Sequence, residues 1–340
     1  MAFQLQDRNA YMSSAELAPP RWKIIAAFAS VYVWWGSTYL AIRYAVETLP
    51  PFMTAGVRFL TAGSILWFFA RLTGADNPTR HQWREASIVG TFLLLGGNGS
   101  VMWAEQYMPS GLAALMIATT PLFMTALDWL IWKGPRPGLR VCLGLLLGFS
   151  GIFLLIRPWE EHTQGAGEAK PIDLAAAAAL VFATLSWSCG SLYGKRADAP
   201  KNPLLTSGMQ MLVGGAIMLT VGLALGEWRR IDPAHVSARS LWSLLHLIVF
   251  GSLVGFSCFS WLIRVAQPAK VATYAYVNPV VAVFLGWAIA GETLTGWAIL
   301  AAAVILSGVV LIVTGTPAKA EKKPDAKPHQ VPDAEVSEPV

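Results

Sequence analysis

The sequence predicts an all-α integral membrane protein with ten transmembrane helices, arranged as two inverted five-helix repeats. The prediction rests on the composition, the length of the apolar runs and a repeated sequence pattern. The 340 residues are 55% hydrophobic and only 13% charged, unlike a soluble domain. Apolar runs of about twenty residues match the length that spans ~30 Å of hydrocarbon. Because lipid offers the backbone no hydrogen-bond partners, these runs are predicted to be helices.

The first five predicted spans are residues 24–45, 52–71, 86–107, 110–132 and 139–156. The third contains the sequence GGNGS from Gly96 to Ser100, and the fourth contains Pro121 near its centre. Proline removes a backbone donor and clashes with a carbonyl one turn earlier, so the fourth span is predicted to be interrupted in mid-membrane. The glycine-rich sequence predicts an interruption of the third span as well. Gly144 and Gly148 of the fifth have the GxxxG spacing that is typical of close helix packing.

The other five predicted spans are residues 172–194, 203–226, 240–263, 268–290 and 295–314. The eighth contains Gly251 and Gly255 near its centre, and the ninth contains Asn278 and Pro279. These two spans are also predicted to be interrupted. Ser307-Gly308 in the tenth follows a run of alanines and favours a packing role.

The second group of spans repeats the first. At an offset of 158 residues, three positions of one group match three of the other: Trp103, Pro121 and Trp129 with Trp261, Pro279 and Trp287. The runs 56–65 and 208–217 match at an offset of 152. Because each copy holds five helices, an odd number, the second copy is inverted relative to the first. Inverted repeats are typical of transporters, in which the halves move about a central site.

The distribution of basic residues predicts the topology. With a cytoplasmic N-terminus, the inner segments hold eighteen of the 25 Lys and Arg residues. The outer segments hold five: Arg157, Lys170, Arg229, Arg230 and Arg239. This positive-inside bias predicts that both termini are cytoplasmic, although the loop at 227–239 departs from it. The net charge of +5 is therefore interpreted as a topology signal and not as a nucleic-acid footprint.

These observations divide the chain into five parts. Residues 1–23 are predicted as a cytoplasmic N-terminal segment, 24–157 and 172–315 as the two repeats, and 158–171 as an extracytoplasmic linker. Residues 316–340, rich in Pro, Lys, Glu and Ala, are predicted as a disordered cytoplasmic tail. The scattered histidines show no metal-ligand spacing, so neither an enzyme nor a metal or other cofactor is expected.

Three stretches resemble a known family. They are WWGSTYLAIRYAVETLPPFMTAGVRFLTAG (34–63), PSGLAALMIATTPLF (109–123) and TYAYVNPVVAVFLG (273–286). They are similar to the EamA family of the drug/metabolite transporter superfamily, and within it to the YedA-like exporters. The resemblance implies two five-helix EamA repeats, a bacterial-type inner-membrane location and export of small metabolites or drugs. It does not indicate the substrate.

Polar and aromatic side chains at the interrupted spans, and in spans one and six, are predicted to line a central substrate cavity. They are Trp34, Trp35, Ser37, Tyr39, Asn98, Trp103, Thr120, Pro121, Trp187, Tyr193, Trp261, Tyr274, Tyr276, Asn278 and Pro279. The clusters around Trp34 and Trp187 have two interpretations, as gates of alternating access or as bulky groups that face lipid. Arg58 and Glu105 are predicted near the outer ends of their spans, as an ion pair or in proton coupling.

No Lys or Arg is predicted at the midplane, which argues against phosphosugars and nucleotide sugars. No Asp or Glu is predicted there either, so a cation exchanger with a buried carboxylate switch is not supported. The expected function is export of neutral or zwitterionic metabolites, such as amino acids, by alternating access. Two alternatives stay open: efflux of lipophilic cationic drugs by the same fold, and a non-transporting membrane sensor or scaffold. The expected partners are a small-molecule substrate and the lipid bilayer, with no nucleic acid, and the oligomeric state is not predicted.

Overall fold

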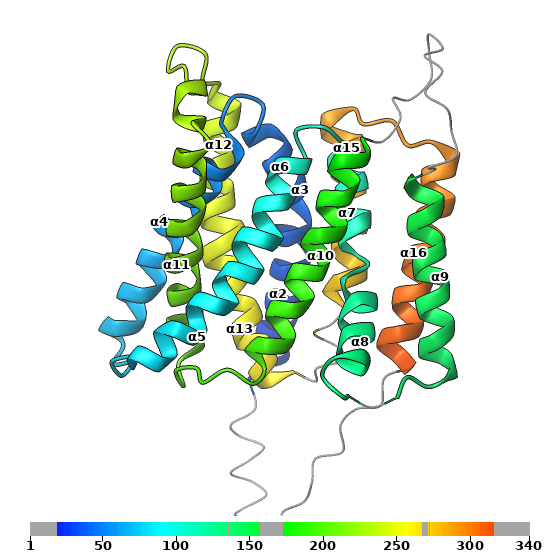
Figure 1. Ribbon diagram of the computed structural model, residues 1–340, viewed down its shortest axis with the longest axis horizontal. Helices are drawn as coiled ribbons and strands as arrows, with labels where there is room; N and C mark the ends of the chain where they lie inside the picture. Colours follow the sequence, from blue (N-terminus) through cyan, green and yellow to red (C-terminus); the bar gives the residue numbers. More distant parts are fainter. Residues whose placement is uncertain (1–18, 135, 157–172, 267–270, 272, 316–340) are drawn as a thin grey trace, which may run out of the picture.

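The computed structural model describes residues 19–134, 136–156, 173–266, 271 and 273–315. The predicted linker 158–171 and tail 316–340 lie outside the described residues, as does most of the predicted segment 1–23. Within the described residues, the regular elements are all helices. Figure 1 shows them as a bundle in which α2 begins and α16 ends at the same end. We call this end proximal and the opposite end distal.

The first repeat contributes five spans, several of them built from consecutive helices. They are α2 (Arg21–Ser30), η1 (Val31–Trp35) and α3 (Gly36–Ala45); α4 (Pro51–Leu72); α5 (Arg80–Gly90), η2 (Thr91–Gly99) and α6 (Ser100–Ala104); α7 (Ser110–Ile117) and α8 (Thr120–Leu130); and α9 (Leu139–Ile156). The elements η1 and η2 are π-helical. The predicted interruptions of spans three and four are thus present, as a π-helix and as a break between α7 and α8.

The second repeat follows the same order. Its spans are α10 (Leu174–Gly194); α11 (Pro203–Ala224); α12 (Ala238–His246), η4 (Leu247–Val254) and α13 (Gly255–Val265); α15 (Tyr274–Ala290); and α16 (Gly296–Gly315). A short 3-10 helix, η3 (Glu227–Arg230), precedes α12. Span eight contains the π-helix η4, whereas α15 stays helical through Pro279, so the interruption predicted for span nine is absent.

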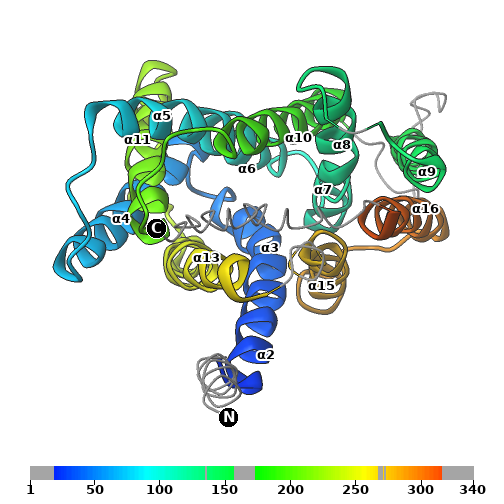
Figure 2. The same ribbon diagram turned by 90° about the horizontal axis from the view of Figure 1, so that it is seen from below.

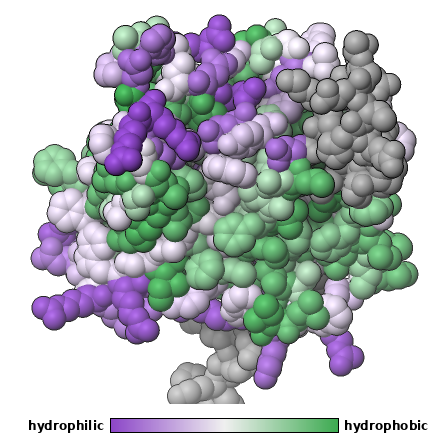
Figure 3. All heavy atoms as spheres, turned by 45° about the horizontal axis from the view of Figure 1, so that its top comes forward, coloured by the Kyte–Doolittle hydropathy of each residue, from purple (hydrophilic) through white to green (hydrophobic). Residues whose placement is uncertain are grey.

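The lengths of the helices agree with ten membrane spans. Within the described residues, eight helices are long and apolar enough to cross a membrane, and two shorter apolar helices cover Leu139–Leu155 and Tyr274–Ala290. Figure 3 shows hydrophobic residues spread across the middle of the visible surface, with hydrophilic residues gathered toward its upper and lower edges. Large side chains such as Phe153, Trp129 and Trp287 are exposed on the outside of the bundle. The predicted all-α membrane fold is confirmed.

Equivalent helices of the two repeats pack against each other in antiparallel pairs. In α4 and α11, a Cβ added at Gly63 would lie 2.8 Å from the backbone nitrogen of Leu212, and one at Gly208 would lie 2.9 Å from that of Trp67. As the residue number rises along α4, the number of the contacted residue in α11 falls, so the two helices run in opposite directions. Helices α9 and α16 form a second such pair. Figure 2 shows the two pairs on opposite sides of the bundle, with the other spans between them.

Backbone conformation also follows the repeat. Among the described residues, positive φ angles occur at Gly74 (86°), Gly226 (73°), Lys133 (54°) and Gly291 (65°). Gly74 and Gly226 are 152 residues apart and follow the equivalent helices α4 and α11. Lys133 and Gly291 are 158 residues apart and follow α8 and α15. Left-handed residues that end equivalent helices at both sequence offsets are independent structural support for the duplication.

Candidate functional site

A cavity of about 150 Å³ lies between the two repeats at the middle of the spans. Its lining comes from seven of the ten spans, and no residue of α9, α11 or α16 contributes to it. Nine of the predicted cavity residues line it: Trp35, Tyr39, Asn98, Thr120, Pro121, Trp187, Tyr274, Asn278 and Pro279. Further lining residues are Thr38, Ile42, Arg58, Gly97, Val101, Ile117, Ala118, Met124, Ala183, Thr184, Gly251, Phe256 and Ala275.

The two repeat-related prolines both lie in the cavity wall. In span four, the proline ring removes the backbone donor that would bond to the carbonyl of Ile117. The Thr120 hydroxyl donates to this carbonyl instead, at 2.6 Å. In span nine, Asn278 stands at the position equivalent to Thr120 and precedes Pro279. Its Oδ1 is buried and has no hydrogen-bond partner. The polar group beside the proline is therefore satisfied within the protein in one repeat and free in the other.

Two tryptophans pack across the repeats in the same way. Trp35 and Trp187 are 152 residues apart, and the glycines Gly97 and Gly255 are 158 residues apart. A Cβ on Gly97 would lie 2.9 Å from the Trp187 ring, and a Cβ on Gly255 would collide with the Trp35 indole. Each repeat thus places its tryptophan on a glycine of the other repeat. Trp35 is also oriented by its Nε1, which donates to the carbonyl of Gly251 at 3.0 Å.

The π-helices η2 and η4 contribute residues to the cavity wall, beside Trp35 and Trp187. In η2, Asn98 Nδ2 donates to the carbonyl of Leu93 at 3.3 Å, so this amide is held by its own helix. Gly251, in η4, presents the carbonyl that holds Trp35. π-helical turns leave backbone groups out of the regular ladder and occur frequently at functional sites. Here they supply the carbonyls that orient two cavity residues.

Arg58 is a cavity residue, which corrects its predicted place near the outer end of span two. Its side chain is 3% exposed, and its Nε donates to Ser252 Oγ of η4 at 3.0 Å. The predicted start of the span was right to within one residue, since α4 begins at Pro51. The direction of the Arg58 side chain, which points toward η4, was not apparent from the sequence. At the start of α4, Glu227 accepts from the backbone N–H of Met53 at 2.8 Å.

The predicted ion pair between Arg58 and Glu105 is absent from the described part of the protein. Both carboxylate oxygens of Glu105 are buried without a hydrogen-bond partner, and so is Arg58 Nη1. The guanidinium near Glu105 belongs to Arg43, whose Nη1 donates to the backbone carbonyls of Glu105 and Gln106 at 2.7 and 3.2 Å. Arg58 is directed toward Ser252 instead. The Glu105 carboxyl is thus buried without a hydrogen-bond partner among the described residues, with the Arg43 guanidinium bonded to its backbone carbonyl.

The other predicted cavity residues lie elsewhere. Trp34 stacks on Phe250 at 4.2 Å between ring centroids, and the hydroxyl of Ser37 lies 2.9 Å from His246 Nε2. Four more are outside the cavity lining: Trp103, Tyr193, Trp261 and Tyr276. Adjacent residues separate because neighbours on a helix point roughly 100° apart. Of the two tryptophans in span one, only Trp35 therefore reaches the cavity.

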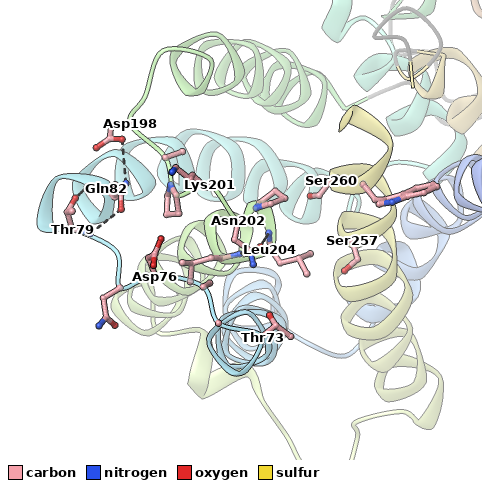
Figure 4. Close-up of a pocket in the computed structure, with 18 residues that line it drawn as sticks. Thr73, Asp76, Thr79, Gln82, Asp198, Lys201, Asn202, Leu204, Ser257 and Ser260 are labelled. Atoms are coloured by element: carbon pink, nitrogen blue, oxygen red, sulfur yellow. Dashed lines mark hydrogen bonds between the residues drawn. The ribbon is translucent and has the colours of Figure 1, made fainter. Parts of the chain in front are cut away.

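Trp261 lines a second and larger hollow, of about 840 Å³, at the proximal end. Figure 4 shows this groove between the loop that contains Thr73 and Asp76, the loop that contains Lys201 and Asn202, and the helix that contains Ser257 and Ser260. The neighbouring residue Phe256 lines the central cavity. Helix α13 is therefore a wall shared by the proximal groove and the central cavity.

Hydrogen bonds join the two repeats at the distal end. Glu292, after α15, accepts hydrogen bonds from the backbone N–H groups of Ser110 and Gly111 in α7, at 2.8 and 3.0 Å. Glu227 similarly accepts from the first turn of α4. Thr48 Oγ1 donates to Ser240 Oγ at 2.8 Å, which joins the loop after α3 to α12. Carboxylates of the second repeat thus cap two helices of the first.

Ten helical spans in two inverted repeats around a midplane cavity define a membrane carrier. The chain belongs to the EamA-like transporter family, which matches residues 21–157 and 174–314. This confirms the resemblance noted in the sequence, and makes the protein a membrane transporter of the EamA type.

Two curated relatives and one solved structure are similar over most of the chain. The uncharacterized inner membrane transporter YedA of Escherichia coli K12 is 36% identical over 293 residues, 86% of this chain and 91% of YedA. A probable amino-acid metabolite efflux pump of Salmonella typhimurium LT2 is 24% identical over 295 residues, 84% of this chain and 93% of the pump. One crystal structure, 17% identical, superposes with a TM-score of 0.56 over 85% of this chain and 95% of its own, and shows the fold alone.

Proposed function

We propose that this transporter exports small neutral or zwitterionic metabolites, amino acids or related compounds, across a bacterial-type inner membrane by alternating access. The observation that supports this most directly is the central cavity, whose wall contains repeat-related residues from both halves. In a carrier with inverted repeats, a site between the halves is reached from either side as the halves move. The relative named as an amino-acid metabolite efflux pump supports the same substrate class.

The size of the cavity favours a metabolite over a drug. Its volume is about 150 Å³, whereas pockets for drug-sized ligands measure roughly 300–1,000 Å³. Its charge points the same way. The lining contains Arg58 and, among the described residues, no Asp or Glu that would attract a lipophilic cation. The aromatic faces of Trp35 and Trp187 suit an apolar part of the substrate.

The two ends of the bundle suggest how access alternates. The distal end is closed by the caps from Glu227 and Glu292, and the proximal end holds the large groove beside α13. We assign the proximal end to the cytoplasm because the inner segments predicted from the sequence hold the excess of Lys and Arg. The conformation described would then accept substrate from the cytoplasm through the groove and release it after the distal caps open.

Transport by the purified protein tests this function. Proteoliposomes would be assayed for counterflow of radiolabelled leucine, phenylalanine and threonine, with a lipophilic cation such as tetraphenylphosphonium as the competing class. We expect saturable amino-acid flux that tetraphenylphosphonium inhibits weakly. Flux of the cation alone would favour the drug-efflux alternative. Absence of flux for every compound would contradict the proposed substrate class.

A further inference from the structure

Two residues of the cavity wall carry buried polar atoms of opposite character that have no hydrogen-bond partner. Arg58 Nη1 is a hydrogen-bond donor of a positively charged group, and Asn278 Oδ1 is an acceptor. Both atoms are buried and lack a hydrogen-bond partner, and both residues line the cavity. Unsatisfied buried polar groups are rare in folded proteins, and each one calls for a specific explanation.

The guanidinium of Arg58 is held in a fixed direction. Its Nε is bonded to Ser252 Oγ at 3.0 Å, and its central carbon lies 4.6 Å from the centre of the Phe59 ring. Gly251 leaves space beside it, since a Cβ there would lie 3.1 Å from Nη2. Among the described residues no carboxylate pairs with Arg58. A charge buried without a counterion costs several kcal/mol, and a bound carboxylate would remove that cost while matching the planar fork of the guanidinium.

Asn278 lies on the other repeat. Its side chain is 6% exposed, in α15 directly before Pro279. The unpartnered Oδ1 can accept a hydrogen bond from an ammonium group. The cavity wall thus contains a positively charged donor on α4 and a neutral amide with a free acceptor on α15.

We propose that Arg58 binds the carboxylate of the substrate and that Asn278 Oδ1 binds its ammonium group. This proposal rests on the proposed function and narrows it to zwitterions, namely free amino acids. Amines and amides, which lack the carboxylate, leave Arg58 unpaired. Because Arg58 belongs to the first repeat and Asn278 to the second, a bound zwitterion joins the two halves. The strength of its binding therefore depends on how the two halves are placed relative to each other. Such a dependence is what couples substrate binding to a change of conformation.

The first test uses the wild-type protein in proteoliposomes and needs no variant. Counterflow of radiolabelled leucine is competed with leucine, leucinamide, 3-methylbutylamine and 4-methylpentanoate. We expect the amide and the amine, which lack a carboxylate, to compete at least tenfold more weakly than leucine. The acid, which lacks the ammonium group, should be intermediate. Equal competition by leucine and leucinamide would overturn the proposal while leaving the proposed function intact, whereas absence of leucine flux would overturn both.

The second test assigns the discrimination to Arg58. In Arg58→Gln, the ratio of inhibition constants of leucinamide and leucine should fall from at least ten toward one, and Arg58→Lys should retain part of the ratio. The matched control is Arg71→Gln, in the last turn of the same helix, where Arg71 donates to the carbonyl of Ala75 outside the cavity. It should keep the wild-type ratio. A purely structural role of Arg58 would lower flux and leave the ratio unchanged, which would contradict the proposal.

Discussion

Trp35 and Trp187 are the residues that most directly connect the repeat to the site. Each lies in the first span of its repeat and packs on a glycine of the other repeat. Each also lines the central cavity. The gate interpretation placed these clusters toward opposite faces, whereas the structure brings both indoles to one cavity. They are therefore positioned to contact a substrate from two sides.

We expect Trp187→Ala to lower the apparent affinity for the transported amino acid about tenfold, equivalent to ~1.4 kcal/mol, because an aromatic contact is lost. The measurement is concentration-dependent counterflow in proteoliposomes. Trp287→Ala is the matched control, since Trp287 is 57% exposed on the outside of the bundle. The assignment of Trp187 to the site would be wrong if the two variants had equal affinities.

Glu105 is the second residue whose environment indicates a function. Its side chain is fully buried, and its carboxylate has no partner among the described residues. Ionisable groups in such membrane positions often belong to proton relays. We expect Glu105→Gln to retain amino-acid counterflow and to lose flux driven by a pH gradient. Net flux that still responds to the gradient would show that coupling does not depend on this carboxyl.

At the scale of elements, the two repeats differ in how their helices are capped. The position equivalent to Glu227 in the first repeat, at an offset of 152 residues, is Ala75. The position equivalent to Glu292, at an offset of 158 residues, is Gly134, so neither equivalent residue has a carboxylate. The carboxylate caps therefore occur on the repeat-two side of each pair and act at the distal end. Because the two ends of the bundle are equivalent by the repeat, we expect this difference to favour a conformation with a closed distal end.

Glu292→Ala should lower the free energy of unfolding by about 2 kcal/mol, because α7 loses hydrogen bonds to a charged acceptor at its N-terminus. Thermal denaturation of the purified protein in detergent would show the decrease as a lower Tm. Glu47→Ala provides the comparison, since the Glu47 carboxylate forms an exposed ion pair with Arg239 at 3.7 Å. An exposed pair of this kind contributes under ~1 kcal/mol. Equal effects of the two variants would argue against a capping role for Glu292.

At the scale of the whole molecule, the charge distribution predicts the membrane orientation. We expect the distal end to face outward, so a membrane-impermeant maleimide applied to intact cells should label Trp228→Cys and not Asn77→Cys. Trp228, in η3, and Asn77, in the loop after α4, are both exposed and lie at opposite ends of the bundle. The three natural cysteines would first be replaced. Labelling of both residues in permeabilised cells is the control. The reverse pattern would invert the proposed topology.

The sequence by itself determined the spans and the duplication. Hydrocarbon requires each crossing helix to be apolar over a defined length, so these features depend on one segment at a time. Only the tertiary structure decided which side of each helix faces the cavity. Apolar side chains surround these helices, and their rotation depends on the neighbours they pack against. For this reason Trp35 lines the site while Trp34 stacks on Phe250.

The same reason explains Arg58. Its side chain reaches the cavity because it points toward η4 and donates to Ser252, a residue far away in the sequence. Packing between the repeats thus placed a buried charge in the cavity that the sequence had predicted to be uncharged.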